Sequence, residues 1–439
     1  MRYDAIIIGA GPGGYAAAIR LGQKGKKVVL VEKDKIGGEC LNYGCIPSKA
    51  IIELASSIDY LKRMKGVQME LKMDMAQWQE WKWGMINRLT GGVETLCKGY
   101  SVEIARGEAV IVDSTHVAVG DKTYEAENLV IATGSSPVKF DSFQGVLYNR
   151  EMLDLKSIPE TLVVIGGGYI GIELGTAMAK LGSKVTVVEM MPTILPGVDP
   201  DLVKPVERKI RELGITVFTD TKVKSVTKAE KYSVVLENGN TMAADTVMLT
   251  VGRKPNISGF GLERLGLAMD GNFIRTDRRK RTSIPNVYAI GDVSGQPMLA
   301  HKAYYDADIA SDNICGIDSE VEYLAMPYVI YSDPEIAYTG SKSTGETYFP
   351  VAANGRALSM NATIGGYRIY HDENGKVKGA GLVAPHASEM ISEISLAVES
   401  GLNAMDIGLT IHPHPTVSEG VKESAEAAYG KPLHFKPAH

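Results

Sequence analysis

The chain has 439 residues, a formal net charge of −5 and 44% hydrophobic residues. This length is too great for one hydrophobic core and indicates roughly three domains of about 150 residues each. The chain lacks the excess of basic residues that binding to nucleic acid or to an anionic membrane surface requires, so we expect neither as a partner.

The cysteine content bears on the compartment. The four cysteines, Cys40, Cys45, Cys97 and Cys315, are too few and too scattered for the disulfide framework of a small secreted domain. The first apolar run, residues 5–8, is too short for a signal-peptide core or a membrane span. We therefore expect a reducing, cytoplasmic setting, where cysteines are more often catalytic or metal-binding than structural.

The chain opens with the pattern of a nucleotide-binding unit. An apolar run at residues 5–8 meets a turn containing Gly9, Gly11 and Gly14, and a small-residue helix leads to a second apolar strand that ends at Glu32. A Rossmann βαβ unit requires this order. The glycines let the backbone approach a pyrophosphate at the helix N-terminus, and Glu32 would accept hydrogen bonds from a ribose diol.

Two thiols follow this unit. Cys40 and Cys45 are separated by four residues, and Pro47 suits the first position of a helix, which places Cys45 beside the helix N-terminus and favours its thiolate. We interpret them as a redox pair in which Cys45 faces a flavin and Cys40 exchanges with substrate. Incidental core cysteines or half a zinc site are the alternatives. No other Cys or His lies within 45 residues, so we expect no metal.

A tryptophan-rich segment comes next. Asp74 and Gln77 predict the start of a helix. One apolar face of this helix comprises Trp78, Trp81, Met85, Leu89 and Leu96. We expect this face to pack in a core rather than to line a substrate channel.

The nucleotide-binding pattern recurs at an offset of 157 residues, with Gly166, Gly168, Gly171 and Glu189. One glycine fingerprint can be a turn that binds nothing, but two copies at identical spacing favour two nucleotide sites. Residues 190–196 include no basic side chain, so the second site should prefer NAD to NADP. The glycines do not decide the first cofactor. NAD in both sites could not couple a hydride to thiols, whereas a flavin could.

Two later segments complete the candidates. The basic run at residues 278–281 precedes Pro285, and its charge pattern favours a solvated loop. The run at residues 412–419 offers histidine as the base that thiol exchange needs near neutral pH, ahead of a helix expected at about residues 417–429. Thr416 and Glu419 fit a capping box, so Glu419 is either a cap or a carboxylate that orients a histidine. We interpret His412 as a packing or positioning residue.

Together these residues resemble the FAD-dependent pyridine nucleotide disulfide oxidoreductases, and the similarity covers essentially the whole chain. Residues 37–49, Gly-Gly-Glu-Cys-Leu-Asn-Tyr-Gly-Cys-Ile-Pro-Ser-Lys, look like the redox motif of the members that oxidise dihydrolipoamide. Residues 129–134 and 288–292 are similar to two further FAD motifs, and residues 252–256 to the end of the NAD domain.

The resemblance implies an α/β fold with two Rossmann-like dinucleotide-binding domains and a C-terminal α+β dimerisation domain. The implied boundaries are 1–150 for the FAD domain, 151–270 for the NAD domain, 271–325 for a central segment completing the FAD site and 326–439 for the dimerisation domain. The implied reaction is oxidation of dihydrolipoamide, with NAD reduction, through FAD and a Cys40–Cys45 disulfide.

The resemblance also implies site residues. His414 matches the base and Glu419 its carboxylate partner, and because the family's histidine comes from the other subunit, an obligate homodimer is implied. Lys49 and Glu173 match an ion pair beside the flavin. The implied FAD- and NAD-binding positions are Gly9, Gly11, Gly14, Glu32, Lys33, Gly38, Lys49, Gly107, Thr133, Gly134, Ser135, Gly291, Asp292, Leu299, Ala300, Gly166, Gly168, Tyr169, Gly171, Glu189, Val223 and Gly252.

Two departures from the family pattern keep other functions open. Tyr169 stands where lipoamide-type members commonly have an aliphatic residue and glutathione reductases a gating tyrosine. This favours a reductase of glutathione-like or other small disulfides, whereas Ser48 and Glu189 oppose it. A flavin redox sensor without turnover is a further alternative. Residues 340–354 look shortened, so a surface helix is expected to be missing, with a bearing on docking to a 2-oxoacid dehydrogenase complex.

Overall fold

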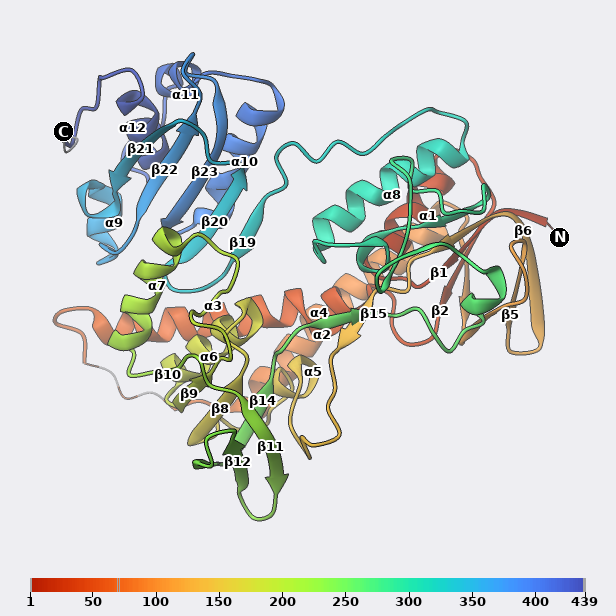
Figure 1. The fold of residues 1–439 in the computed structure, drawn as a ribbon, viewed down its shortest axis with the longest axis horizontal. Helices are drawn as coiled ribbons and strands as arrows, with labels where there is room; N and C mark the ends of the chain where they lie inside the picture. The colour runs from red at the N-terminus through yellow and green to blue at the C-terminus, as the bar shows by residue number, and fades with distance from the viewer. Residues whose placement is uncertain (1, 69, 71, 437–439) are drawn as a thin grey trace.

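The structure is a computed structural model that describes residues 2–68, 70 and 72–436. Figure 1 shows three units: the N-terminal unit on the right, a second unit below and the C-terminal unit at upper left. The two Rossmann-like sheets and the separate antiparallel sheet with its helices confirm the predicted fold class.

The first unit has a mixed sheet with strand order β3-β2-β1-β6-β5-β4 and with β18 beside β6. Ala5 and Ile7 of β1 face one core, whereas Ile6 and Ile8 face the other, because helices or loops cover both faces of a parallel sheet. The strands are β1 (Arg2–Ile8), β2 (Val28–Glu32), β3 (Glu103–Arg106), β4 (Ala109–Ile111), β5 (His116–Val119), β6 (Lys122–Ile131) and β18 (Val287–Ala289). The helices are α1 (Pro12–Gln23), α2 (Gly38–Tyr43), α3 (Cys45–Arg63), α4 (Met75–Gly99) and α8 (Ala300–Ile314).

The second unit repeats the βαβ arrangement in a parallel sheet of order β10-β9-β8-β14. An antiparallel sheet, β11-β12-β13, packs beside it. The elements are α5 (Asn149–Met152), β8 (Thr161–Ile165), α6 (Tyr169–Leu181), β9 (Lys184–Val188), α7 (Pro200–Glu212), β10 (Thr216–Phe218), β11 (Val223–Lys228), β12 (Tyr232–Leu236), β13 (Thr241–Ala244) and β14 (Thr246–Leu249). There are also two small ribbons, β7 (Ser135–Pro137) with β15 (Arg253–Pro255) and β16 (Met269–Asp270) with β17 (Phe273–Ile274). Ile274 of β17 is buried in the core of the first unit.

The C-terminal unit is an antiparallel sheet of order β19-β20-β23-β22-β21. Residues 341–344 carry the chain from β20 past β23 and β22 to β21 at the far edge, and no helix lies in this connection. Its Lys342 pairs with Asp199, the cap of α7. The elements are β19 (Tyr328–Ile330), β20 (Glu335–Gly340), β21 (Gly345–Pro350), α9 (Gly355–Ser359), β22 (Gly366–His371), β23 (Val377–Ala384), α10 (Ala387–Glu399), α11 (Ala404–Leu409) and α12 (Glu419–Ala427).

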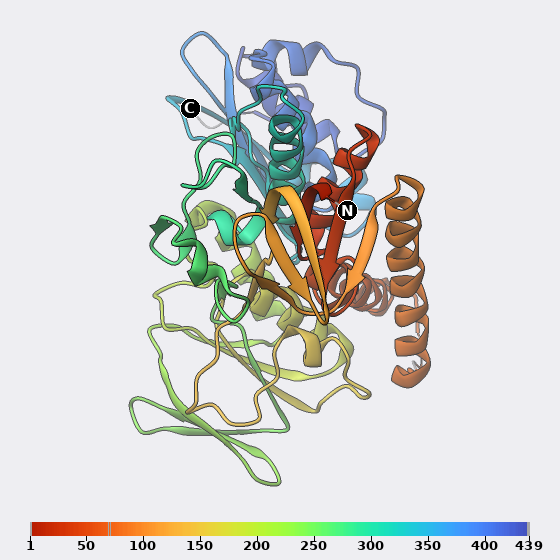
Figure 2. The same cartoon turned by 90° about the vertical axis from the view of Figure 1, so that its right-hand side faces the viewer.

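The tryptophan-rich helix α4 corrects one expectation. Asp74 caps it as predicted, accepting hydrogen bonds from the backbone of Ala76 and Gln77. Only part of its predicted core face is buried: Trp78 packs, half-buried, against a hydrophobic core, whereas Trp81 is 58% exposed. In Figure 2, α4 (orange-brown) stands on the outer side of the first sheet. Gln79 and Lys82 point inward because both donate hydrogen bonds to the carbonyl of Leu153. Leu89 and Leu96 of the predicted face are exposed as well.

The basic run corrects a second expectation. It is not a solvated loop, because Lys280 is only 4% exposed and Arg278 and Arg279 pair with acidic residues 318–322. These acids lie 39 or more residues away in sequence, beyond the reach of a local charge pattern. The segment between α8 and β19 therefore packs against the run.

Candidate active site

A disulfide joins Cys40 of α2 to Cys45, the first residue of α3, with the two Cα atoms 4.7 Å apart. Gly37 precedes α2 in the left-handed region at φ 94°, which favours glycine. The helix after Cys45 begins two residues earlier than Pro47 predicts, because Gly44 already acts as its cap. Pro47 remains in the first turn, where its missing N–H is not needed. Cys45 therefore lies at a helix N-terminus, which stabilises a thiolate.

The disulfide lies in the wall of a cavity of about 480 Å³ in the first unit. This volume is within the range of small-molecule and cofactor sites. The cavity lining includes most of the implied FAD positions, whereas Gly14 and Leu299 lie outside it. Lining residues among the sequence candidates are Gly9, Gly11, Glu32, Lys33, Gly38, Cys40, Cys45, Lys49, Gly107, Thr133, Gly134, Ser135, Tyr169, Glu173, Gly291, Asp292 and Ala300.

The glycine turn of the first unit fits a dinucleotide. A Cβ on Gly9 would lie 2.5 Å from the carbonyl oxygen of Ala132, and a Cβ on Gly14 would lie 1.8 Å from that of Gly9. Only glycine allows this turn, which presents the N-terminus of α1 to the cavity. The Glu32 carboxylate accepts hydrogen bonds from the backbone of Ala10 and Asp34, both at 2.8 Å, and lines the cavity at the end of β2.

The second copy reproduces this geometry. Glu189 accepts hydrogen bonds from the backbone of Gly167 at 2.6 Å and Met191 at 2.7 Å, the positions equivalent to Ala10 and Asp34. Gly166 has φ 105°, and a Cβ on Gly171 would lie 2.1 Å from the carbonyl oxygen of Gly166. Gly168 caps α6, Gly252 has φ 112°, and Val223 is buried in the core beside β8.

A partly buried ion pair joins the two nucleotide units. Lys49 Nζ of α3 lies 3.0 Å from Glu173 Oε2 of α6, and the Glu173 side chain is only 5% exposed. The other Glu173 oxygen accepts a hydrogen bond from the backbone of Tyr331, whose ring lies 4.2 Å from Lys49 Nζ. Tyr169, one helical turn before Glu173, also lines the cavity. The second unit therefore forms part of the wall of the first unit's site.

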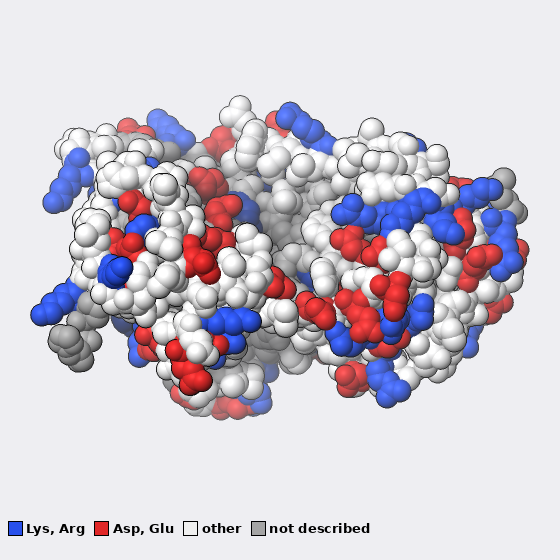
Figure 3. Space-filling view, turned by 90° about the horizontal axis from the view of Figure 1, so that it is seen from above, with Lys and Arg blue, Asp and Glu red and all other residues white. Residues whose placement is uncertain are grey.

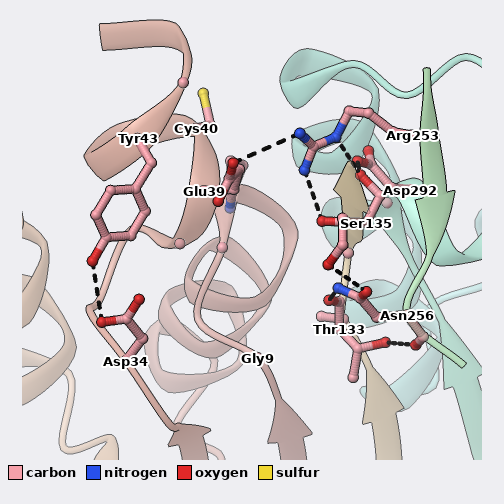
Figure 4. A pocket seen from close by; sticks show the side chains of 18 of the residues that line it. Gly9, Asp34, Glu39, Cys40, Tyr43, Thr133, Ser135, Arg253, Asn256 and Asp292 are labelled. Atoms are coloured by element: carbon pink, nitrogen blue, oxygen red, sulfur yellow. Dashed lines mark hydrogen bonds and ion pairs between the residues drawn. The ribbon is translucent and has the colours of Figure 1, made fainter. Parts of the chain in front are cut away.

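A polar network missed in the sequence crosses the cavity (Figure 4). Arg253 donates hydrogen bonds from Nε to Ser135 Oγ at 2.8 Å and from Nη2 to the Ser135 carbonyl at 2.7 Å, and Ser135 Oγ donates to Asp292. Arg253 Nη1 also lies 3.6 Å from Glu39, the residue before Cys40. The only signal in the sequence was the position of Arg253 beside Gly252. Glu39, Ser135 and Asp292 come from three other segments of the chain, which no local pattern links to Arg253.

The mouth of the cavity carries aromatic and cationic side chains. Tyr43 donates a hydrogen bond to Asp34 at 3.1 Å, and the guanidinium of Arg150 lies 3.5 Å from the Tyr43 ring centre. Burial, together with the bond to Asp34, raises the pKa of Tyr43 to about 12. Tyr43 thus stays a neutral donor at physiological pH.

The histidine tail lies on the C-terminal unit. His414 Nδ1 lies 2.8 Å from Glu419 Oε1, and Glu419 Oε2 accepts a hydrogen bond from the Thr416 backbone, also at 2.8 Å. The capping box is not complete, because Ser418 and not Thr416 precedes α12, and the Thr416 hydroxyl donates to the Pro413 carbonyl. The helix α12 begins at Glu419 rather than at residue 417. Burial opposes the ionisation of Glu419, but the bonds to the Thr416 backbone and to His414 outweigh it and hold the pKa of that carboxyl below its usual range.

One chain does not bring His414 to the disulfide. Its side chain is 78% exposed, and α12 lies on the outer side of the C-terminal unit, far from α2 (Figure 1). His412 is different: its side chain is 5% exposed and its Nε2 lies 3.3 Å from Glu393. That carboxylate raises the pKa of His412.

The charges on the surface are mixed in sign, as the composition leads one to expect. Figure 3 shows Lys and Arg interspersed with Asp and Glu over one face, rather than gathered in a field of one sign. No helix within the described residues has the length and apolar character needed to cross a bilayer. Over the same residues, no group of three or more His, Cys, Asp or Glu side chains has the geometry of a metal site.

Known proteins resemble this chain over nearly its whole length. Residues 3–307 match the pyridine nucleotide-disulphide oxidoreductase family, and residues 326–425 match the dimerisation domain of that family. The dihydrolipoyl dehydrogenases of Geobacillus stearothermophilus and Bacillus subtilis are 44% and 45% identical, and each alignment covers 98% of this chain and 97% of the relative.

Solved structures agree with this assignment. LpdA from Mycobacterium tuberculosis superposes with a TM-score of 0.90 at 28% identity, covering 97% of this chain and 99% of that protein. The HOCl-induced flavoprotein disulfide reductase RclA from Escherichia coli gives a TM-score of 0.88 at 26% identity, covering 97% and 99%. With a disulfide in the wall of a dinucleotide cavity and two copies of the nucleotide cradle, the chain belongs to the pyridine nucleotide-disulphide oxidoreductases, the family whose dihydrolipoyl dehydrogenases use FAD and NAD.

Proposed function

We propose that this protein oxidises dihydrolipoyl groups to the cyclic lipoyl disulfide and reduces NAD, using Cys40 and Cys45 as its redox couple. The observation that carries the proposal is the position of the Cys40–Cys45 disulfide, in the wall of the dinucleotide cavity and at the N-terminus of α3. The 44–45% identity to dihydrolipoyl dehydrogenases supports the choice of substrate.

The exchange proceeds by two thiolate attacks. One substrate thiolate attacks Cys40 Sγ, which breaks the Cys40–Cys45 bond and releases Cys45 as a thiolate. The second substrate thiol then attacks the substrate sulfur of the mixed disulfide, forms the lipoyl ring and releases Cys40. Cys45 leaves readily because the N-terminus of α3 stabilises its negative charge.

His414 of the partner subunit takes the proton from the substrate thiol. Its exposure and its distance from α2 in one chain support a second subunit as the source, as does the dimerisation domain at residues 326–425. Glu419 accepts the N–H of its imidazole and stabilises the protonated ring. The active site is thus shared across a homodimer.

The first cavity would hold FAD, with Gly9, Gly11 and Glu32 at the adenosine and pyrophosphate end and with Asp292 on the ribityl chain. When bound, FAD supplies the two-electron chemistry that links a dithiol to a nicotinamide. Lys49, fixed by Glu173 and the Tyr331 ring, keeps a positive charge at the junction of the two nucleotide units. The second cradle, with Glu189, would hold NAD.

The experiment compares two histidine variants. His414→Gln should lower lipoamide turnover about a hundredfold or more, as loss of a general base does, with flavin content unchanged. His434→Gln is the matched control, because His434 is also exposed and pairs with a glutamate, Glu423, at 2.5 Å. Parental turnover by the His414 variant would refute the assignment of the base.

A second measurement follows the thiols directly. Dihydrolipoamide added without oxygen or NAD should make Cys40 and Cys45 reactive toward iodoacetamide, one label on each, as mapped by mass spectrometry. Cys97, which is buried, should stay unlabelled. Labelling without steady NADH formation would instead identify a redox sensor.

A second function is favoured by one residue. Tyr169 lines the cavity at the junction of the two units, where it can gate access to the nicotinamide side, and RclA is a disulfide reductase by name. Reduction of small disulfides such as glutathione disulfide would use the same residues in reverse. Rates measured with lipoamide and with glutathione disulfide decide between them, and we expect lipoamide to be faster at least tenfold.

The physiological setting is part of the proposal. We place the enzyme in the cytoplasm, because a substrate dithiol and a dissociable disulfide are compatible with a reducing compartment. The lipoyl group of a 2-oxoacid dehydrogenase complex is the proposed partner substrate. Copurification of such a complex with the tagged protein would test this assignment.

A further inference from the structure

The basic run at residues 278–281 forms hydrogen bonds and ion pairs with the segment that leads to the C-terminal unit. We call residues 315–327, between α8 and β19, the linker. The backbone N–H of Val321 donates to the carbonyl of Arg278 at 2.9 Å, and Arg278 Nη2 donates back to the Val321 carbonyl at 3.2 Å. The ion pairs that flank these bonds are Arg278 with Glu320 and Glu322, and Arg279 with Asp318 and Glu320.

The third residue of the run turns inward to a buried carboxylate. Lys280 Nζ lies 3.2 Å from Asp306 Oδ2, and Lys302 Nζ lies 3.0 Å from the same oxygen. Asp306 is completely buried, and the two lysine side chains are 5% exposed or less. Lys280 adopts φ 64°, a left-handed conformation that costs a lysine free energy and persists only where the surroundings hold it.

This carboxylate holds the cofactor turn. Asp306 Oδ2 accepts a hydrogen bond from the backbone N–H of Gly291 at 3.0 Å, and Lys302 donates to the Gly291 carbonyl at 3.4 Å. Gly291 itself has φ 73° and is followed by Asp292, which lines the cavity. Both polar groups of the Gly291 residue are thus bonded to the buried cluster.

The linker reaches the same carboxylate from the opposite side. Tyr323 donates its phenolic hydrogen to Asp306 Oδ1, and its ring packs against Tyr305 with centroids 5.7 Å apart. Burial, together with Asp306, raises the pKa of Tyr323, so the phenol remains a donor. Burial opposes the ionisation of Asp306, but Lys280 and Lys302 outweigh it and lower the pKa of Asp306.

We propose that Asp306 is a positioning residue that couples the cofactor turn to the linker, so that FAD retention and docking of the linker depend on each other. One carboxylate bonds Gly291 with one oxygen and Tyr323 with the other, and neither Asp306 nor Tyr323 lines the cavity. Asp292 would stay in position to hold FAD only while Asp306 holds Gly291, and Tyr323 stabilises that arrangement from the linker. The proposal rests on FAD binding in the first cavity.

The variants separate coupling from general loss of structure. Tyr323→Phe removes one hydroxyl group and keeps the ring, and it should speed FAD release about tenfold, as loss of a hydrogen bond to a charged group does. Asp306→Asn should speed release by about a hundredfold or more, because it also leaves two buried lysines unpaired. Asp308→Asn is the control: it is exposed on the same helix and pairs with Arg20. Its release rate should equal that of the parent.

The measurement must distinguish faster release of FAD from a general loss of stability. FAD release is followed by the rise of flavin fluorescence on dilution, and thermal unfolding is measured with and without FAD. In Tyr323→Phe the unfolding temperature without FAD should fall by a few degrees, because a buried hydrogen bond is lost, and the gain on adding FAD should also shrink. Parental release by both Tyr323→Phe and Asp306→Asn would overturn the proposal.

An experiment on the unmodified protein guards against variants that fail to fold. A glutamate-specific protease can cleave the linker after Glu320 or Glu322, both partly or fully exposed. Removal of FAD from the full-length protein should speed this cleavage at least fivefold, as peptide mapping would show. Equal cleavage with and without FAD would also overturn the proposal. Failure to bind FAD at all would instead refute the proposed function.

Discussion

Ala10 and Gly167 occupy the same place in the two nucleotide-binding units, and each donates its backbone N–H to the glutamate that ends the second strand. Around this common core the units differ. In the first, α2, α3, Arg253 and Asp292 close a cavity around the glycine turn, whereas the residues after Glu189 in the second are the exposed Met190 and Met191. The glycine fingerprint therefore specifies a turn that can bind a dinucleotide phosphate. The other segments that pack around this turn decide which reaction takes place there.

The largest effect is expected from a substitution that abolishes cofactor binding in the first unit and leaves the second unit unchanged. Gly14→Ala would place a Cβ 1.8 Å from the Gly9 carbonyl oxygen, so α1 must move away from β1. We expect FAD affinity to fall by about a hundredfold or more, with loss of all turnover. Flavin absorbance after gel filtration measures this, and full flavin content would contradict the assignment of the first cradle.

The equivalent change in the second unit should leave the protein yellow. Gly171→Ala would place a Cβ 2.1 Å from the Gly166 carbonyl oxygen. NADH formation should be lost, while dihydrolipoamide still exposes Cys40 and Cys45 to labelling. Gly175→Ala, on the same helix, is the control, because its Cβ would meet Val164 at an ordinary 3.5 Å. Flavin loss in Gly171→Ala alone would mean that the units do not act separately.

A smaller effect tests the second acid. Glu189→Gln keeps the shape but removes the charge that would bind the ribose diol, and we expect KM for NAD to rise about tenfold. Flavin content and labelling of Cys40 should not change. An unchanged KM would show that Glu189 serves only the turn, through its bonds to Gly167 and Met191.

The smallest effect concerns the choice between NAD and NADP. Met190 is 61% exposed directly after Glu189, so an arginine there could reach a 2′-phosphate without disturbing the core. Met190→Arg should raise kcat/KM for NADP several-fold, with NAD turnover nearly unchanged. Lys33 is the equivalent residue in the first unit. Lys33→Arg should change kcat/KM neither for NAD nor for NADP.

The comparison also explains which features could be predicted from the sequence. The cradles, Cys40, Cys45 and the pairing of His414 with Glu419 depend on spacing within a few residues, which a sequence displays directly. By contrast, the inward side of α4 is chosen by the carbonyl of Leu153, over 70 residues away. A polar side chain that finds such a partner can be buried, so hydrophobic periodicity alone was wrong for Trp81, Leu89 and Leu96, which are exposed.

The same reasoning applies to charge. A run of four basic residues reads as solvated unless its counterions are known, and those of Arg279 and Lys280 come from the linker and from α8. The network of Arg253 was missed for a similar reason. The ribbon of β7 and β15 brings Arg253 beside Ser135, and Glu39 comes from α2, more than 200 residues away in sequence. Long-range polar pairs thus account for most of the misassigned residues.

The connection of residues 341–344 sets a minimum length for the C-terminal unit. β20 and β21 are three strand spacings apart, about 14 Å, and the five virtual bonds from Gly340 to Gly345 span at most about 17 Å. The segment is therefore almost taut. A longer loop would span this distance easily, whereas removal of a single residue would leave the segment fully extended and would pull the edge strand out of the sheet.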